Sequence, residues 1–152
     1  MVFSQLIEND HGFEAAYLYR GLCFIQLEKY KLALKDFNYL TERHPKASIK
    51  ENLYSSRTYG SKNQTRMDFI DAYFQRGVTK YFMDSLISAK RDFEFVLSRS
   101  NRIPICRNYL ANIYYLQGDH QNACAQIRMI KRMSPKYFEE ENIDYLKKLN
   151  CQ

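Results

Sequence analysis

Apolar residues recur along this chain at helical spacing, in paired segments that are separated by short polar breaks. Residues 14–27 and 31–44 form one such pair, with the break near Glu28 and Lys29. Residues 104–137 repeat the arrangement around Gln117-Gly118-Asp119, which is a typical turn sequence. The chain has only 5 Gly and 3 Pro, which disfavours a many-turned β fold. The pattern therefore predicts antiparallel helix pairs in an all-α fold.

Three positions recur at fixed distances within these pairs. Gly21, Ala33 and Phe37 correspond to Gly77, Ala89 and Phe93 in a second copy and to Ala111, Ala123 and Ile127 in a third. The second and third copies are 34 residues apart, and the first two are 56 apart. Antiparallel helices approach closely only where a side chain at the crossing is small. We therefore expect Gly21 to make room for Phe37.

This pattern resembles that of the tetratricopeptide repeat family, whose motif spans 34 residues. The third copy carries Leu110, Ala111, Tyr114, Gly118, Ala123 and Pro135 in register, and the first carries Tyr17, Gly21, Phe24, Tyr30, Ala33, Phe37 and Pro45. The second departs from the motif at Lys80 and Asn101, and Arg20, Arg76 and Arg107 are further departures. The resemblance implies a right-handed α-solenoid of three helix pairs.

We expect one domain over residues 1–152, with a partial helix before the repeats and a capping helix after them. The predicted parts are a half-repeat at 1–13, repeats at 14–47, 70–103 and 104–137, a basic insertion at 48–69 and a capping helix at 138–152. Phe3 and Leu6 fall where the second helix of an earlier repeat would place them. The chain is therefore expected to start inside a repeat, either as a cap or as part of a longer protein.

The net charge of +6 is concentrated in one segment. Six cations and a single anion, Glu51, lie between residues 43 and 66; the cations are Arg43, Lys46, Lys50, Arg57, Lys62 and Arg66. The insertion is interpreted as a solvated loop, with docking to an acidic or phosphate-bearing partner, or folding back onto the groove, as alternatives. A groove that binds nucleic acid should be basic along its length. Because this one is not, nucleic-acid binding is the weaker hypothesis.

The four cysteines, Cys23, Cys106, Cys124 and Cys151, match no zinc or redox spacing. We interpret them as reduced thiols, mostly buried in helices, which weakly favours a cytoplasmic location. No stretch reaches the ~18 apolar residues that a membrane helix needs. The N-terminus also lacks the features of a signal peptide.

Catalytic motifs are missing from the sequence. His11, His44 and His120 have no second ligand at helical spacing, and no glycine-rich phosphate loop or nucleophile elbow occurs. Asp36, Asp71, Asp84 and Asp92 are interpreted as parts of a solvated face. We predict no enzyme, no metal and no cofactor.

The resemblance implies that the first helices of the repeats line a concave groove that binds peptides or helices. The predicted groove residues are Leu18, Leu22, Ile25, Phe74, Val78, Tyr81, Phe82, Asn108, Asn112, Tyr115 and Leu116. The family positions that grip the acidic tails of heat-shock chaperones are occupied by Leu18, Leu22, Gln75, Ile105 and Tyr109, so that activity should be absent.

An apolar groove of this kind should be covered. The candidates are a partner's helix or peptide, the insertion or terminal helix of the chain itself, and a second copy in a homodimer. The predicted function is non-catalytic protein–protein recognition, as a scaffold or adaptor. A nucleic-acid-binding module that uses residues 43–66 and a self-associating structural subunit are the alternatives.

Overall fold

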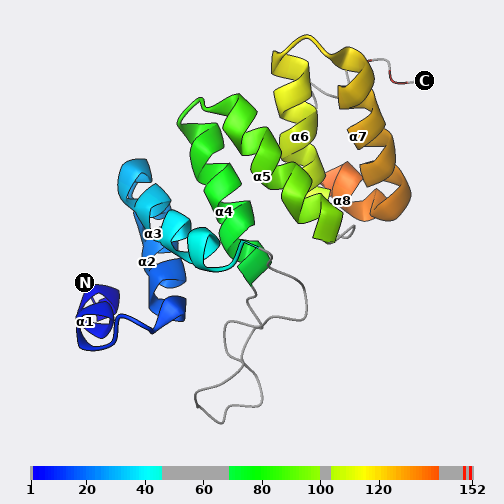
Figure 1. Cartoon of the computed structure of the whole chain (residues 1–152). Helices are drawn as coiled ribbons and strands as arrows, with labels where there is room; N and C mark the ends of the chain where they lie inside the picture. Colours follow the sequence, from blue (N-terminus) through cyan, green and yellow to red (C-terminus); the bar gives the residue numbers. More distant parts are fainter. Residues whose placement is uncertain (1, 46–68, 100–103, 141–148, 150, 152) are drawn as a thin grey trace. The chain divides into compact units, whose positions relative to one another are not determined.

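The computed structural model describes residues 2–45, 69–99, 104–140, 149 and 151. These residues form α-helices and no strand (Figure 1), so the all-α prediction is confirmed. The helices are α1 (Val2–Asn9), α2 (Glu14–Gln26), α3 (Tyr30–Arg43), α4 (Phe69–Phe82), α5 (Leu86–Arg99), α6 (Pro104–Leu116), α7 (His120–Met133) and α8 (Pro135–Glu140).

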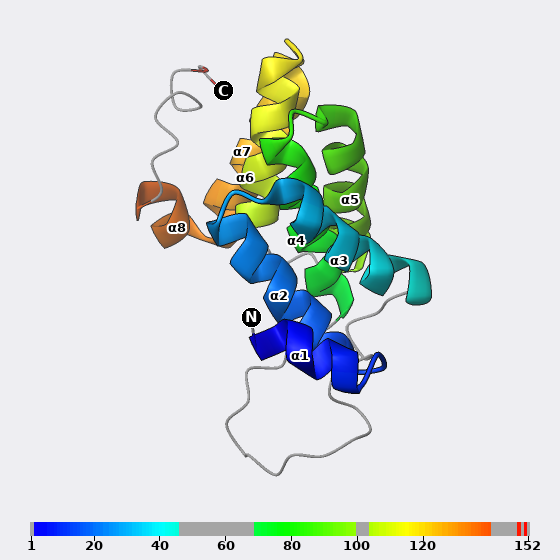
Figure 2. The same cartoon turned by 90° about the vertical axis from the view of Figure 1, so that its left-hand side faces the viewer.

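The chain divides into two compact units, Met1–Asp92 and Phe93–Gln152. Helix α5 contributes its first half to one unit and its second half to the other. In the first unit α1 packs against α2, α2 against α3, and α3 against α4 (Figures 1 and 2). In the second unit α6 packs against α7, and α7 against α8.

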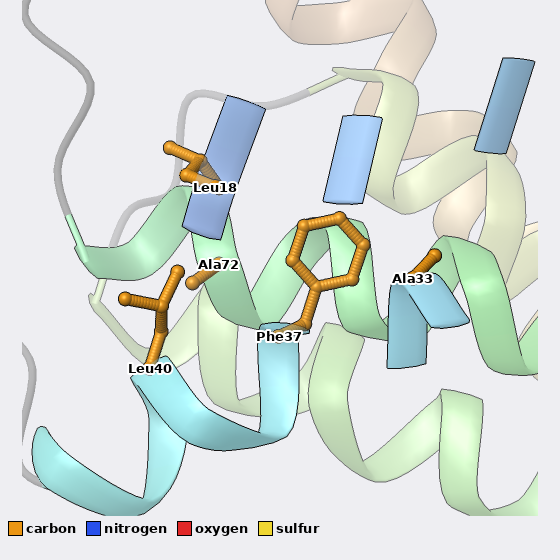
Figure 3. Close-up of a cluster of buried hydrophobic side chains, with 5 residues drawn as sticks. All are labelled: Leu18, Ala33, Phe37, Leu40 and Ala72. Atoms are coloured by element: carbon orange, nitrogen blue, oxygen red, sulfur yellow. The ribbon is translucent and has the colours of Figure 1, made fainter. Parts of the chain in front are cut away.

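The core of the first unit is built around Phe37. Its ring is fully buried and packs with Leu18, Ala33, Leu40 and Ala72 (Figure 3). A β-carbon at Gly21 would lie 2.6 Å from Cε1 of Phe37. The expectation that Gly21 makes room for Phe37 is therefore confirmed.

Two Arg–Asp pairs join the helices of the first unit. Arg20 on α2 donates two hydrogen bonds to Asp36 on α3, at 2.9 and 2.6 Å. Arg76 on α4 makes the same two-pronged contact with Asp92 on α5, at 2.9 and 2.6 Å. The expectation that these aspartates lie on a solvated face is wrong, because Asp36 and Asp92 are 2% and 4% exposed. Buried carboxylates need such charge-assisted partners, which explains the two arginines that depart from the family motif.

The second pair belongs to a larger network. Lys80 also donates to Asp92, at 2.7 Å. Arg76 donates to the Thr41 hydroxyl and, at 3.4 Å, to the side-chain Oδ1 of Asn38 on α3. Lys80 is another departure from the family motif, and this contact accounts for it. The network ties α3, α4 and α5 together.

The turns between paired helices use one backbone conformation at the same place in each copy. Glu28 (φ 56°), Asp84 (φ 57°) and Gly118 (φ 75°) are left-handed, and they are spaced by the same 56 and 34 residues as the repeats. Only the third copy uses glycine, which adopts this conformation without steric cost. The backbone therefore preserves a repeat that the turn sequences do not show.

A disulfide joins α7 to the C-terminal end of the second unit. Cys124 and Cys151 are bonded, with their Cα atoms 5.3 Å apart. The interpretation of all four cysteines as reduced thiols is therefore wrong for this pair, because a separation of 27 residues along the chain does not reveal proximity in space. Disulfides persist in oxidising compartments, so the cysteines no longer support the predicted cytoplasmic location.

The predicted capping helix at 138–152 falls only partly within the described residues. Helix α8 ends at Glu140, residues 141–148 lie outside the described residues, and Leu149 and Cys151 are not helical. Leu149, Cys151 and Phe138 pack against the buried pair Ala111 and Ile127. The last repeat is thus covered by α8 and by residues that the disulfide holds in place.

Candidate functional site

The predicted groove residues of α2 do not share one environment. Leu18 is 1% exposed and belongs to the core beside Phe37 and Ala72, so its assignment to a binding surface is corrected. Helix α4 supplies Ala72 to this core. It therefore covers part of the apolar surface of α2 for which an outside partner was one of the predicted covers. Leu22 and Ile25 pack against the same core but stay half-buried.

The predicted groove residues of α4 differ in how far they are exposed. Val78 is buried, with 6% of its surface exposed, so its assignment to a binding surface is also corrected. Phe74 and Tyr81 are half-buried, and Phe82 is 50% exposed. Burial raises the pKa of the Tyr81 hydroxyl above 10.0, so it stays protonated and can donate a hydrogen bond at neutral pH. The accessible apolar set of the first unit is therefore Leu22, Ile25, Phe74, Tyr81 and Phe82, called here the first-helix face.

In the second unit the predicted residues lie on α6. Asn108, Asn112 and Tyr115 are half-buried, and Leu116 is 60% exposed. Tyr115 packs against the Ala111 and Ile127 pair, the same pair that Leu149 covers. The Oδ1 atom of Asn108 is buried without a hydrogen-bond partner.

In the third repeat the interhelical arginine is Arg107, which lies three residues before Leu110, the repeat position of Arg20 and Arg76. It is 8% exposed, and it donates from Nη1 to the Gln126 side-chain oxygen at 2.9 Å. Gln126 stands at the repeat position of Asp36 and Asp92. The third pair thus replaces a charged acceptor with a neutral amide.

Little of the predicted basic segment falls within the described residues. Arg43 lies at the end of α3 and pairs with Glu14 at 3.1 Å, and His44 contacts the same carboxylate at 2.9 Å. Lys46, Lys50, Arg57, Lys62 and Arg66 lie outside the described residues. Arg43 therefore serves a contact between α2 and α3, and the segment's role stays a prediction.

Neither a metal site nor a membrane span emerges from the described residues. Across them, no three His, Cys, Asp or Glu side chains gather as metal ligands would. His44 stacks on Phe69 with ring centroids 3.4 Å apart, and His11 and His120 are exposed. No helix in the described ranges is long and apolar enough to cross a bilayer.

The free cysteines differ in burial. Burial raises the pKa of the Cys106 thiol to about 12, and the thiol contacts the Phe93 carbonyl oxygen at 3.4 Å. A thiol that stays protonated is a poor nucleophile. Cys106 is thus a packing residue, as the sequence suggested, and Cys23 is half-buried.

The positions equivalent to the chaperone-tail clamp carry no cation. Leu18 is in the core, Tyr109 stacks on Phe93 with centroids 5.1 Å apart, and Ile105 is 41% exposed. Leu22 and Gln75 are half-buried. An acidic tail would find no charged partner at these five positions, and the predicted absence of that activity stays a prediction.

Comparison with known proteins identifies the repeat. Residues 15–47, which include α2 and α3, match the family model described as tetratricopeptide repeat. No curated protein matches the chain. Among solved structures, the chain resembles MamA of MSR-1, with a TM-score of 0.64 and 16% identity over 88% of this chain, and it spans 64% of that protein's length.

Two further structures share the fold. Another crystal structure of MamA has a TM-score of 0.67 and 13% identity, over 97% of this chain and 82% of the other. A tetratricopeptide repeat protein from Parabacteroides merdae has a TM-score of 0.56 and 19% identity, over 97% of this chain and 60% of the other. At these identities the likeness concerns the fold, which is the helix-pair solenoid. Residues 15–47 thus match a tetratricopeptide repeat, and the rest of the chain resembles tetratricopeptide repeat proteins in its fold.

Proposed function

We propose that this protein is a non-catalytic scaffold or adaptor that binds a protein segment on the first-helix face of α2 and α4. The observation that carries the proposal is the exposure of that face. Leu22, Ile25, Phe74 and Tyr81 stay half-buried and Phe82 half-exposed after the core is packed. Large apolar side chains that remain accessible in a group are typical of interaction surfaces.

The chemistry of the face favours a partner with apolar anchors. Aromatic side chains such as Phe74 and Tyr81 provide large contact areas at low conformational cost and are enriched at binding hot spots. An amphipathic helix or an extended peptide with bulky apolar residues would satisfy this surface.

On α6 the corresponding positions are more polar. Asn108 and Asn112 are half-buried and carry side-chain amides. Backbone N–H groups of an extended segment can donate hydrogen bonds to side-chain amides. We propose that α6 presents a separate, more polar surface of the second unit, with Tyr115 and Leu116 as its apolar contacts.

The test combines capture with solution mass. Phe74→Glu with Tyr81→Glu should abolish recovery of a saturable partner from extracts of cells that make the protein. A matched control, Ser88→Glu with Ser98→Glu, adds the same charge at exposed positions of α5 and should retain it. Light scattering after size exclusion shows whether the partner is a second copy. Equal recovery and equal mass for all three proteins would contradict the proposal.

A further inference from the structure

A second apolar surface lies over the turns of the first unit, and it shares only Phe82 with the predicted groove. Leu27, Leu32, Phe82 and Ile87 are 54%, 46%, 50% and 66% exposed. Leu27 and Leu32 flank the turn between α2 and α3, and the other two flank the turn between α4 and α5. Isolated exposed apolar residues are ordinary, but a contiguous group marks an interaction site.

The two turns are joined into one surface. The rings of Tyr30 and Phe82 stack with centroids 5.6 Å apart, which connects the start of α3 to the end of α4. Next to this stack is an open hollow of about 430 Å³, lined by Glu28, Lys29, Tyr30, Lys31, Leu32 and Met83. That volume suits one or two bulky side chains of a bound peptide.

The rim of the hollow is positively charged. Lys29 and Lys31 line it, and Lys35 follows one turn along α3 on the side of Lys31. Within the described part of the chain, no ion pair forms at Lys29, Lys31 or Lys35, whereas the arginines Arg20, Arg43 and Arg76 are all paired. Glu28 is the single acidic residue of the lining. The surface therefore combines an apolar floor with unpaired cations at its edge.

The two turns that border the hollow have a well-defined backbone geometry. Glu28 and Asp84 hold left-handed turns of matching geometry, with φ of 56° and 57°. Backbone hydrogen bonds close both turns, from Lys29 N to Phe24 O at 2.8 Å and from Ser85 N to Lys80 O at 2.9 Å. A preformed surface loses little entropy when a ligand binds.

From these features we propose that this hollow, called here the turn site, binds a peptide segment that carries a bulky apolar side chain flanked by acidic residues. The apolar side chain enters the hollow beside Leu32, Tyr30 and Met83, and the flanking carboxylates pair with Lys29 and Lys31. Charge complementarity sets the preference for an acidic segment over a basic one. The turn site is separate from the first-helix face except at Phe82, and it does not depend on the function proposed for that face.

The test uses three fluorescein-labelled peptides of equal length. One places a Leu-Leu pair between glutamates, one places the same pair between lysines, and one keeps the glutamates but replaces the leucines with serines. Fluorescence anisotropy measures binding to the full chain up to millimolar protein. The glutamate-flanked Leu-Leu peptide should bind at least about 10-fold more tightly than either of the others, a difference of about 1.4 kcal/mol.

Two charge-reversal variants distinguish binding at the turn site from a general effect of the protein's charge. Lys29→Glu with Lys31→Glu should weaken binding of the glutamate-flanked Leu-Leu peptide by about 10-fold or more. Lys131→Glu with Arg132→Glu makes the same charge change at exposed positions of α7 and should alter it less than about 2-fold. Leu32→Ser, at a half-exposed position, should weaken binding without unfolding the protein, which circular dichroism verifies.

Three results would overturn the turn site: equal binding of all three peptides, equal loss in both charge variants, or no binding. Amide shifts in ¹H–¹⁵N spectra locate the peptide. Shifts at Tyr30, Leu32 and Met83 support the turn site. Shifts confined to Leu22, Ile25 and Phe74 would overturn it and would leave the function proposed for the first-helix face standing.

Discussion

The ring of Phe37 occupies the space in which a side chain at Gly21 would begin. The distances from that β-carbon position to Cε1 and Cζ of the ring are 2.6 and 2.7 Å, closer than non-bonded carbon atoms approach. Phe37 is fully buried, and Leu18, Ala33 and Leu40 pack in the same core. The ring cannot retreat, so the crossing of α2 and α3 depends on glycine at this position.

Gly21→Ala should therefore destabilise the first unit. Overpacking of a closed core costs roughly 1–3 kcal/mol, which exceeds the ~1 kcal/mol that alanine gains over glycine in a helix. Urea unfolding measures the free energy. In the Gly21→Ala protein, Phe37→Leu should lower the free energy of unfolding less than it does in the parent. The smaller leucine leaves space for the alanine methyl group at the crossing. A Gly21→Ala protein as stable as the parent would contradict the close packing of α2 on α3.

Asp92 holds the junction of α3, α4 and α5 through Arg76 and Lys80. Asp92→Asn keeps the shape but leaves two cations beside a neutral amide, and we expect a loss of about 3 kcal/mol in the free energy of unfolding. Asp84→Asn is the matched control, because Asp84 is exposed and asparagine tolerates its left-handed backbone. Equal stabilities of the two variants, measured by thermal and urea unfolding, would show that the buried pair contributes nothing.

The disulfide between Cys124 and Cys151 should stabilise the second unit. Loops of this length contribute about 2–4 kcal/mol when closed. Cys124→Ser with Cys151→Ser should lower the urea midpoint of the second unit by a corresponding amount, as should reduction of the parent. Mass spectrometry of unreduced peptides should recover residues around 124 and 151 as one linked species. Recovery of four free thiols would contradict the bond.

The buried thiol of Cys106 should make a pH-dependent contribution to stability. Because the pKa of Cys106 is raised to about 12 from its ordinary 9.0, its thiol stays protonated in the folded protein while the unfolded chain ionises. The unfolded state then binds fewer protons, so stability from this thiol is complete below pH 9 and is lost as pH rises toward 12. Iodoacetamide at pH 9 should modify half-buried Cys23 first and Cys106 only in denaturant. Equal rates at both would contradict the burial of Cys106.

The helix pairs and the Gly21–Phe37 crossing could be predicted because both arise from local spacing. The position of Leu18 could not be predicted from its repeat position alone, since Ala72 of the next repeat covers it across a gap of more than fifty residues. Asp36 and Asp92 looked like surface residues because a carboxylate is normally solvated. Their arginine partners are each 16 residues away on another helix, and only packing brings them together.

The candidate sites could be predicted from the sequence less completely than the fold. The first-helix face follows from repeat positions, but which of its members stay exposed depends on packing between helices distant in sequence, as with Ala72 against Leu18. The turn site depends on Tyr30 meeting Phe82 across two turns, a contact with no signal in either segment alone. The spacing of Cys124 and Cys151 likewise matches no motif.

The most direct test of protein recognition on the first-helix face is site-specific photocrosslinking. Benzoylphenylalanine in place of Phe74, and at exposed Ser98 as the control, is irradiated in the cells that make the protein, and adducts are identified by mass spectrometry. We expect one discrete protein adduct at Phe74 that Ser98 does not give, and its loss when Tyr81→Glu is added. The same adducts from both positions, or none from Phe74, would contradict recognition on this face.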